Sequence, residues 1–114
     1  ESWFECPALI GVDAIYSANT AHIMHWSAVC SMFAGAGQLL KSEGLFLLYG
    51  PFSYAGAHTS DGNRVFDQSL RARDPQMGIR DLDALEALGA DAGLDLEHDQ
   101  AMPANNRLLV WRRR

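Results

Sequence analysis

The sequence predicts a small α/β protein with about four strands, two of them parallel and the last two forming an antiparallel hairpin, and with three helices. Residues 45–52 (LFLLYGPF) form an apolar run that ends at a glycine and a proline, as in a strand with helices over both faces. Residues 25–41 before it carry apolar side chains at helical spacing. Residues 94–98 and 108–111 have the character of half-buried strands.

Composition sets the class of protein. The 114 residues are 48% apolar and 20% charged, which is ordinary for one globular domain. No apolar run approaches the roughly 20 residues that span a bilayer, and we expect neither a signal peptide nor a membrane partner. Cys6 and Cys30 form no CxxC pair and are expected to be free thiols in the cytoplasm. The net charge of -5 argues against nucleic acid, and residues 112–114 (RRR) are expected to be a solvated tail.

The first half of the chain reads as strand, helix and strand. Residues 12–18 alternate as a strand, with Val12, Ala14 and Tyr16 on one face and Ile15 on the other. A polar loop follows, and then the helix over residues 25–41. Its inward residues are expected to be Trp26, Val29, Cys30, Phe33, Gly37 and Leu40. Residues 42–44 (SEG) should end this helix, whose length fits a crossover between two parallel strands.

The second half reads as two helices and a hairpin. Residues 53–60 form a polar loop, and Thr59, Ser60 or Asp61 can cap a helix that runs to about residue 73. Its inward side chains are expected to be Val65, Phe66, Ser69 and Leu70. Asp81 caps a third helix with leucines at helical spacing, and Gly93 ends it. Residues 102–106 (MPANN) then turn the chain between the last two strands.

Several motifs at fixed spacing cover nearly the whole chain. They are N-x-x-H-I-x-x-W from Asn19, F-A-G-A from Phe33, L-Y-G-P-F from Leu48, G-x-H-T-S from Gly56, N-x-x-F-D-x-S-L-x-x-R-D-P from Asn63, G-I-R-D from Gly78 and M-P-A-N-N from Met102. These motifs and the order of elements resemble the second half of a class I S-adenosylmethionine-dependent methyltransferase. That fold is Rossmann-like, and its last two strands form an antiparallel hairpin. The motifs are similar to one methyltransferase-like family, catalogued as a domain of unknown function.

The resemblance implies S-adenosylmethionine as cofactor, but the sequence lacks the half of the fold that binds this cofactor. The family's cofactor-binding half begins with a strand and a glycine-rich loop, followed by an acidic residue at the end of the second strand. Nothing in this sequence matches them, because residues 35–37 (GAG) lie inside the expected helix. We therefore expect residues 1–114 to be a single truncated domain that supplies the substrate-side half. Alone it should neither catalyse nor bind the cofactor. The alternative is a self-associating small-molecule-binding or structural module.

Candidate site residues follow the two parallel strands, at the edge where α/β sheets place ligands. Asn19 and His22 come after the first strand, and the resemblance places their loop against cofactor and substrate. A neutral histidine there can act as a base or orient a substrate, although both residues could instead bond the loop and cap the next helix. Tyr49, Pro51 and Phe52 follow the second strand and could form an apolar wall or pack in the core.

A second group of candidates could close over that pocket. His58, Asn63 and either Arg71 or Arg73 belong to it, and an arginine would recognise a carboxylate or phosphate. The alternative for the arginines is an ordinary solvated helix face. Asn105 and Asn106 are typical turn residues. His22 and His25 lack a third ligand at a supporting spacing, so we expect no metal.

The expected partner is a second copy of the chain. Without a neighbour, the strand over residues 12–18 would be an open apolar edge, and such edges pair with other chains. The N-terminal arm, residues 1–11 with Trp3 and Phe4, is apolar enough to lie at the same interface.

Overall fold

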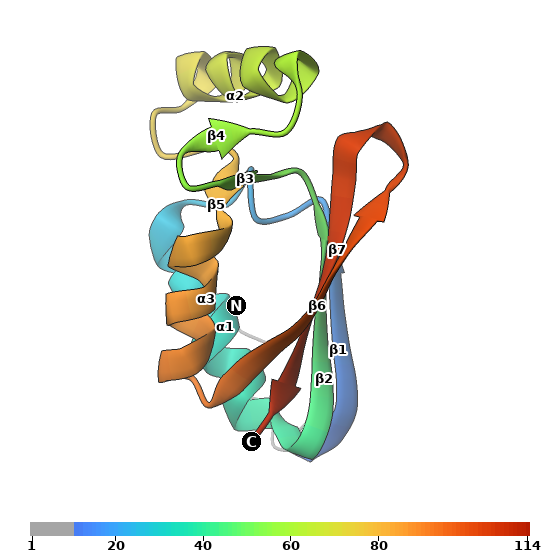
Figure 1. Ribbon diagram of the computed structural model, residues 1–114. Coiled ribbons are helices and arrows are strands. Elements are labelled where there is room, and N and C mark those ends of the chain that lie inside the picture. The colour runs from blue at the N-terminus through green and yellow to red at the C-terminus, as the bar shows by residue number, and fades with distance from the viewer. Residues whose placement is uncertain (1–10) are drawn as a thin grey trace.

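The computed structural model describes residues 11–114, and its main feature is a four-stranded sheet in the order β1-β2-β7-β6 (Figure 1). The strands are β1 (Val12–Ala18), β2 (Leu40–Gly50), β6 (Leu94–Met102) and β7 (Asn106–Arg113). β1 and β2 are parallel, while β7 is antiparallel to both β2 and β6. The predicted class, with a parallel pair and an antiparallel C-terminal hairpin, is confirmed. The N-terminal arm lies outside the described residues, apart from Gly11.

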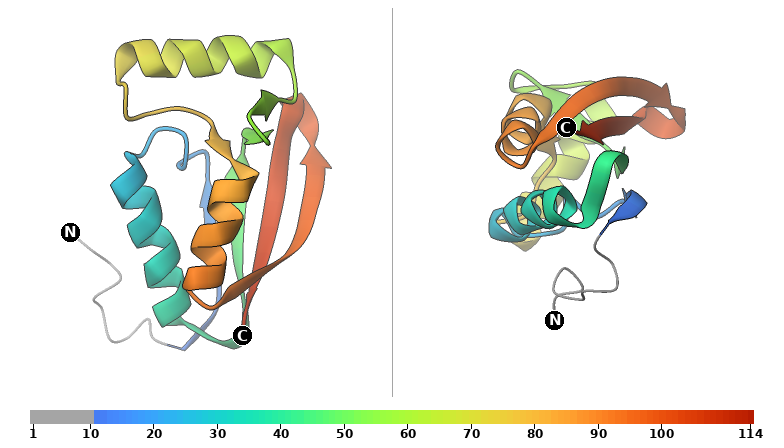
Figure 2. Two further views of the ribbon diagram at one scale, coloured as in Figure 1. Left: turned by 60° about the vertical axis from the view of Figure 1, so that its left-hand side comes forward. Right: turned by 90° about the horizontal axis from the view of Figure 1, so that it is seen from below.

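Residues 11–114 also form three helices, as predicted: α1 (Trp26–Leu39), α2 (Asp61–Arg73) and α3 (Leu82–Asp91). α1 and α3 lie together on one face of the sheet, and α2 crosses its upper end (Figures 1 and 2). That end carries the carboxyl termini of β1 and β2. A second, small sheet lies beneath α2 and was not predicted. It joins β3 (Phe52–Tyr54), β4 (Ala57–His58) and β5 (Arg80–Asp81) in the order β4-β3-β5.

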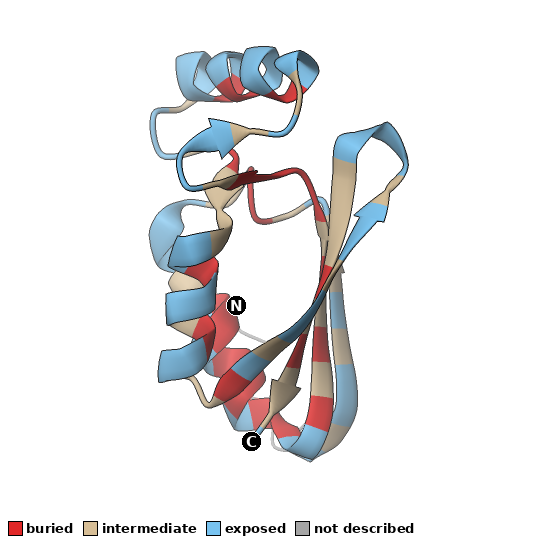
Figure 3. Ribbon diagram, in the orientation of Figure 1, coloured by how far each residue is buried: buried red, intermediate tan, exposed pale blue. Residues whose placement is uncertain are grey.

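The hydrophobic core fills the space between the main sheet and the helices α1 and α3 (Figure 3). Its centre is aromatic. The ring centroids of Phe33 and Trp111 lie 5.0 Å apart, edge to face, and Phe46 stacks against Trp111 at 5.7 Å. All three side chains are buried. Aromatic pairs of this geometry stabilise a core beyond the area they bury.

The prediction that β2 lies under helices on both faces is not what the described residues show. Phe46 and Leu48 point into the core, whereas Leu45, Leu47 and Tyr49 are only half-buried on the opposite face. No helix among residues 11–114 covers that opposite face, which we call the open face. Its apolar side chains come from three strands through register pairs such as Tyr16–Leu47 and Leu47–Val110. The remaining members are Ala14, Ala18, Leu45, Tyr49 and Leu108.

The first crossover differs in detail from the prediction. α1 ends at Leu39, whose carbonyl accepts a hydrogen bond from the Gly11 N–H at 2.7 Å, and residues 42–44 belong to β2. Val12 packs on the core together with Ile15, because the register between β1 and β2 shifts just after Val12. The buried face of α1 includes Met32 and Ala36, while Trp26 at its start is 37% exposed.

Helix α2 has the predicted bounds and cap, but of its four predicted inward residues only Leu70 is buried, and Ser69 is exposed. Ser60 is the N-cap, and its hydroxyl accepts the Asn63 N–H at 3.0 Å. The buried residues are Asn63, Asp67 and Leu70, while Val65 and Phe66 are 50% and 39% exposed. A helix that buries an amide and a carboxylate and exposes apolar groups must pack on a polar surface.

The C-terminal hairpin is longer than predicted. β6 continues to Met102, and a short turn at η3 (Pro103–Asn105) leads into β7. The expectation of a solvated basic tail is wrong. Arg112 Nε donates to Glu97 at 2.8 Å, Arg113 Nε donates to the Gly37 carbonyl at 2.7 Å, and Arg114 pairs with Asp95. No helix among residues 11–114 is long and apolar enough to cross a membrane.

Gly37 allows α1 and α3 to approach closely. A Cβ at Gly37 would lie 2.2 Å from the backbone oxygen of Ala92, just after α3. We expect Gly37→Ala to lower the free energy of unfolding by about 1–3 kcal/mol, as other overpacked cores do. Gly62→Ala is the matched control, because a Cβ there meets only Ser60 Oγ at 3.8 Å and alanine favours the helix by about 0.5–1 kcal/mol. Urea unfolding of both variants checks this, and equal effects would contradict it.

Candidate functional site

Asn19, His22 and Gly50 meet at the carboxyl edge of the parallel strands. Asn19 follows β1 with a φ of 58°, and its N–H donates to the Tyr49 carbonyl at 2.8 Å. A Cβ on Gly50 would lie 3.8 Å from His22 Nδ1 and 3.9 Å from the Asn19 Cα. Two of the residues singled out from sequence are thus adjacent, at the edge where they were expected.

His22 is the chemically distinctive residue of this edge. Its side chain is only 7% exposed, and the Phe66 ring contacts it edge-on with centroids 5.5 Å apart. Burial, and then the positive charge of Arg80, lower the pKa of His22 below its ordinary value. Within residues 11–114, no hydrogen bond engages either ring nitrogen. A neutral imidazole with an available nitrogen can accept a proton or a hydrogen bond from a bound molecule.

The apolar candidates after β2 lie in different places. Phe52 is fully buried in the core, and Pro51 is buried beside it. Tyr49 lies on the open face, where its hydroxyl accepts a hydrogen bond from Asn106 Nδ2 at 3.3 Å. The aromatic ring beside His22 comes instead from Phe66 on α2.

Asn63 links α2 to the turn of the C-terminal hairpin. Its Nδ2 donates to Thr59 Oγ1 and to the Asn105 carbonyl, both at 3.2 Å. The side chain is buried, and these bonds satisfy its amide nitrogen. Asn63 therefore positions α2 over the end of the sheet.

A pocket of about 530 Å³ lies between α2, the small sheet and the first turns of α1 and α3. We call it the arginine pocket. Its lining residues are Trp26, Ser53, Gly56, His58, Asp67, Arg71, Ile79, Arg80, Asp81 and Ala84. Two sequence candidates, His58 and Arg71, meet here. Arg73, the alternative to Arg71, is an exposed residue at the end of α2 and is not in the lining.

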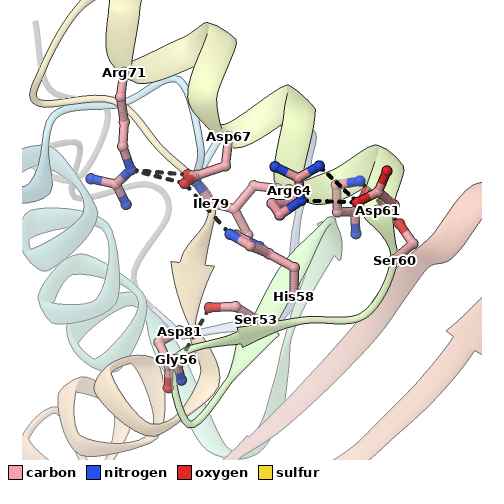
Figure 4. A network of polar contacts seen from close by, with 11 residues as sticks. Ser53, Gly56, His58, Ser60, Asp61, Arg64, Asp67, Arg71, Ile79 and Asp81 are labelled. Carbon is pink, nitrogen blue, oxygen red and sulfur yellow. Dashed lines mark hydrogen bonds and ion pairs between the residues drawn. The ribbon is translucent and has the colours of Figure 1, made fainter.

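Asp67 holds the upper wall of the arginine pocket together (Figure 4). Its Oδ1 accepts the Ile79 N–H at 2.8 Å, and Arg71 Nε donates to both carboxylate oxygens at 3.1 and 3.0 Å. His58 Nε2 lies 3.5 Å from Oδ2. The other ring nitrogen of His58, Nδ1, is buried and has no hydrogen-bond partner in the described chain.

Asp81 holds the lower wall of the arginine pocket together by accepting hydrogen bonds. It is the predicted N-cap of α3, where Oδ1 accepts the Asp83 N–H at 3.0 Å. Its Oδ2 accepts the Gly56 N–H at 2.7 Å and the Ser53 hydroxyl at 3.2 Å. The Gly56 N–H is the main cause that lowers the pKa of Asp81, so the carboxylate stays charged.

Arg80 lines the arginine pocket and forms hydrogen bonds to two loops. Its guanidinium donates to the carbonyls of Ala21 at 3.1 Å, Met24 at 2.6 Å and Gln76 at 2.7 Å. It also lies 5.5 Å from the centre of the Trp26 ring. Burial, and then the charge of Arg71, lower the pKa of Arg80. Two cations thus face one pocket.

Sequence reasoning missed Arg80, Asp67 and Trp26 as site residues. A signal was present for Asp67, because Asp67 and Arg71 are spaced i, i+4 on one helix. Arg80 had no such local signal, since its importance comes from burial against a loop nearly 60 residues earlier.

His25 does not join His22. Its Nε2 lies 2.7 Å from Asp74 Oδ2, on the outer side of the loop. No group of three or more histidine, cysteine, aspartate or glutamate side chains among the described residues could hold a metal ion.

Tyr54 ties the small sheet to the C-terminal hairpin. Its hydroxyl donates to Asp99 at 2.6 Å, and Arg107 Nε donates to the same carboxylate at 2.8 Å. Burial and the bond to Asp99 raise the pKa of Tyr54 to about 12. Because an unfolded tyrosine has a pKa near 10, this stabilisation is complete below about pH 10 and is lost as the pH rises toward 12.

We therefore expect one phenol to ionise near pH 12 in an ultraviolet absorbance titration, and Tyr54→Phe to remove that step. Tyr16→Phe is the control, since Tyr16 is 63% exposed. A titration in which the Tyr54 variant keeps the late step would contradict the assignment.

The sheet order, the helices on one face and the polar carboxyl edge define an α/β protein whose fold is similar to part of several solved methyltransferase structures. The whole chain matches the mitomycin 7-O-methyltransferase MmcR with a TM-score of 0.81 at 17% identity, over 33% of that chain. An O-methyltransferase family protein from Burkholderia thailandensis gives 0.78 at 16% identity, with 96% of this chain and 32% of that one covered. LepI, solved in complex with SAM, gives 0.76 at 13% identity over 92% of this chain and 27% of LepI. The chain thus spans about a third of the length of these structures.

A match to a protein family is more specific than the similarity of folds. Residues 3–113 match the family described as "Protein of unknown function (DUF938)", and the chain belongs to it.

Proposed function

We propose that this chain is the substrate-side, C-terminal half of a class I S-adenosylmethionine-dependent methyltransferase that modifies a small molecule. The observation that carries the proposal is His22. It is a buried imidazole with a lowered pKa and no hydrogen-bond partner in the described chain, and it lies at the carboxyl edge of two parallel strands. Ligands of open α/β sheets bind at this edge.

The proposed role of His22 is that of a general base. Methyl transfer to a hydroxyl or amine leaves a proton on the acceptor, and a neutral imidazole within hydrogen-bond reach can take it. Asn19, held by its bond to the Tyr49 carbonyl, would orient the acceptor. Phe66, 39% exposed and in contact with His22, would form an apolar side of the acceptor site.

The proposed cofactor is S-adenosylmethionine, which supplies the methyl group. The solved neighbours include one with bound SAM, and the motifs of this chain resemble the same superfamily. The glycine-rich strand and loop that would hold its amino acid and ribose have no match in these residues. We propose that a further segment, in the same or another chain, supplies these contacts. The free thiol of Cys30 fits a cytoplasmic setting.

Calorimetric titration with S-adenosylhomocysteine tests how the cofactor site is divided. We expect no heat from the 114 residues alone, and binding when the proposed further segment is supplied. A micromolar dissociation constant for the 114 residues alone would contradict the proposed division. No binding by the chain together with that segment would overturn the methyltransferase proposal.

A variant of His22 tests the proposed base. With the proposed further segment present, His22→Asn should lower turnover of S-adenosylmethionine by about 10²–10⁴-fold and remove the corresponding ionisation from the pH profile. His25→Asn is the matched control, because His25 pairs with Asp74 away from this edge. Equal losses in the two variants would exclude a special role for His22.

A second candidate function is that of a self-associating module, and the open face favours it. Tyr16 on the edge strand β1 is 63% exposed, and Leu47 and Val110 continue the apolar row. Among residues 11–114, β1 pairs only with β2, so its outer backbone groups are available to another strand. We propose a homodimer in which a second copy covers β1, with the N-terminal arm as a further contact.

Light scattering at micromolar concentration tests the homodimer. Tyr16→Lys should shift a dimer toward monomer, because a charge on an edge strand opposes pairing. A monomer before any substitution would overturn this proposal. A dimer unaffected by Tyr16→Lys would place the interface elsewhere and overturn the proposed interface.

A further inference from the structure

The lining of the arginine pocket contains two arginines and two aspartates, and only one of the arginines, Arg71, is paired with a carboxylate. Asp67 is engaged by the Ile79 N–H and by Arg71, and Asp81 is engaged by two backbone N–H groups and the Ser53 hydroxyl. Both carboxylates therefore act as structural acceptors that hold the walls in place. In the described chain, Arg80 has no carboxylate partner at all, and its bonds go to neutral carbonyls.

Some N–H groups of the two guanidinium groups also have no hydrogen-bond partner among the described residues. Arg71 binds Asp67 through Nε alone, so its two terminal nitrogens have no hydrogen-bond partner among the described residues. The Arg71 guanidinium lies close to the backbone of Gly78, since a Cβ at Gly78 would lie 2.7 Å from its central carbon. The forked donors of arginine match the two oxygens of a carboxylate.

We propose that the arginine pocket binds the carboxylate of a small organic acid with an apolar body. The carboxylate would lie between Arg71 and Arg80. Trp26, Ile79 and Ala84 in the same lining would contact the hydrocarbon part. A volume of about 530 Å³ falls in the range of small-molecule sites.

His58 adds a further group to this pocket. Its Nδ1 is a buried nitrogen without a hydrogen-bond partner in the described chain, and such atoms are rare because leaving them unpaired costs free energy. Its Nε2 faces Asp67 at 3.5 Å, so the ring is already oriented by the wall. His58 therefore contributes to the wall of the arginine pocket through its contact with Asp67.

Binding at the arginine pocket does not depend on methyl transfer, although the pocket is connected to the edge that carries His22. Arg80 donates to the Ala21 carbonyl, one residue before His22, and its charge is one of the causes that lower the pKa of His22. If the proposed function also holds, the acceptor would be an acid whose carboxylate is anchored one loop away from the base.

Four small molecules test the arginine pocket, with benzoate as the reference. Benzoate has a carboxylate and an apolar body, acetate lacks the body, benzyl alcohol lacks the charge, and inorganic phosphate replaces the carboxylate with another oxyanion. We expect benzoate to bind most tightly and to shift the Trp26 indole resonance in a nitrogen–proton correlation spectrum. No shift with benzoate would overturn the proposal. Equal binding of benzyl alcohol or of phosphate would overturn the carboxylate assignment.

Variants then locate the bound carboxylate. Arg71→Gln should weaken benzoate binding by about 10- to 100-fold, the effect of losing a hydrogen bond to a charged group. Arg73→Gln, two residues further on the same helix and outside the lining, should leave it unchanged. Should Arg71→Gln fail to fold, Arg71→Lys decides, because it keeps the charge near Asp67 and loses the fork. Unchanged benzoate binding in whichever Arg71 variant folds would overturn the proposal.

Discussion

Trp111→Ala is expected to lower the free energy of unfolding by about 3–5 kcal/mol, a large share of the 5–15 kcal/mol that holds a typical domain together. Trp111 is fully buried, and its ring lies against Phe33 and Phe46 at the centre of the core. Gly89 on α3 fits the indole so closely that a Cβ there would lie 2.6 Å from Nε1. The truncated side chain therefore leaves a cavity between the sheet and α3.

Trp111→Phe is the matched control for that result. The indole Nε1 is buried without a hydrogen-bond partner in the described residues, so phenylalanine removes volume but breaks no hydrogen bond. We expect a cost of about 1–2 kcal/mol, since an aromatic ring of smaller size remains. Chemical denaturation measures both variants. A Phe variant as unstable as the Ala variant would show that the indole N–H has a partner.

Asp67→Ala is expected to cost about 2–4 kcal/mol and to loosen α2 selectively. The substitution leaves the buried Ile79 N–H without an acceptor, and it removes the charge that Arg71 binds. Because α2 contributes only a few apolar side chains to the fold, this carboxylate is a main part of its attachment. The arginine pocket would lose its upper wall at the same time.

Hydrogen exchange across α2 separates this effect from global unfolding. Protection of α2 should fall more than that of β2 and β7. Asp61→Ala on the same helix is the control, because Asp61 is an exposed carboxylate whose pair with Arg64 contributes within about 0.5 kcal/mol. Uniform loss of protection in the Asp67 variant would argue against a local role.

The parts of the fold that the sequence predicted correctly have local signals. The strand over residues 12–18 has apolar residues at Val12, Ala14, Ile15 and Tyr16, and Ser60 and Asp81 are caps whose side chains accept backbone N–H groups two or three residues further on. The small sheet escaped prediction because its strands have only two or three residues each and pair across 28 positions, as Ser53 does with Asp81. Neither length nor composition marks such segments.

The inner face of α2 was predicted incorrectly for a different reason. Hydrophobic periodicity assumes that a helix packs on an apolar core, and under that assumption Val65 and Phe66 point inward. The surface beneath α2 is polar, so Asn63 and Asp67 are buried in their place. His22 and His58 could be singled out from residue type and position, whereas the importance of Arg80 depends on which distant carbonyls it reaches.

The position of β7 has a consequence for how the protein is made. β7 is the last strand along the chain, yet it lies between β2 and β6 and pairs with both. During synthesis, β2 must therefore wait beside β1 alone until some 60 further residues have left the ribosome, as the pairing of Leu48 with Leu109 implies. Long-range pairing of this kind slows folding and leaves apolar strand edges exposed meanwhile. Nascent chains that stall before β7 emerges should accordingly depend on chaperones more than the released protein does.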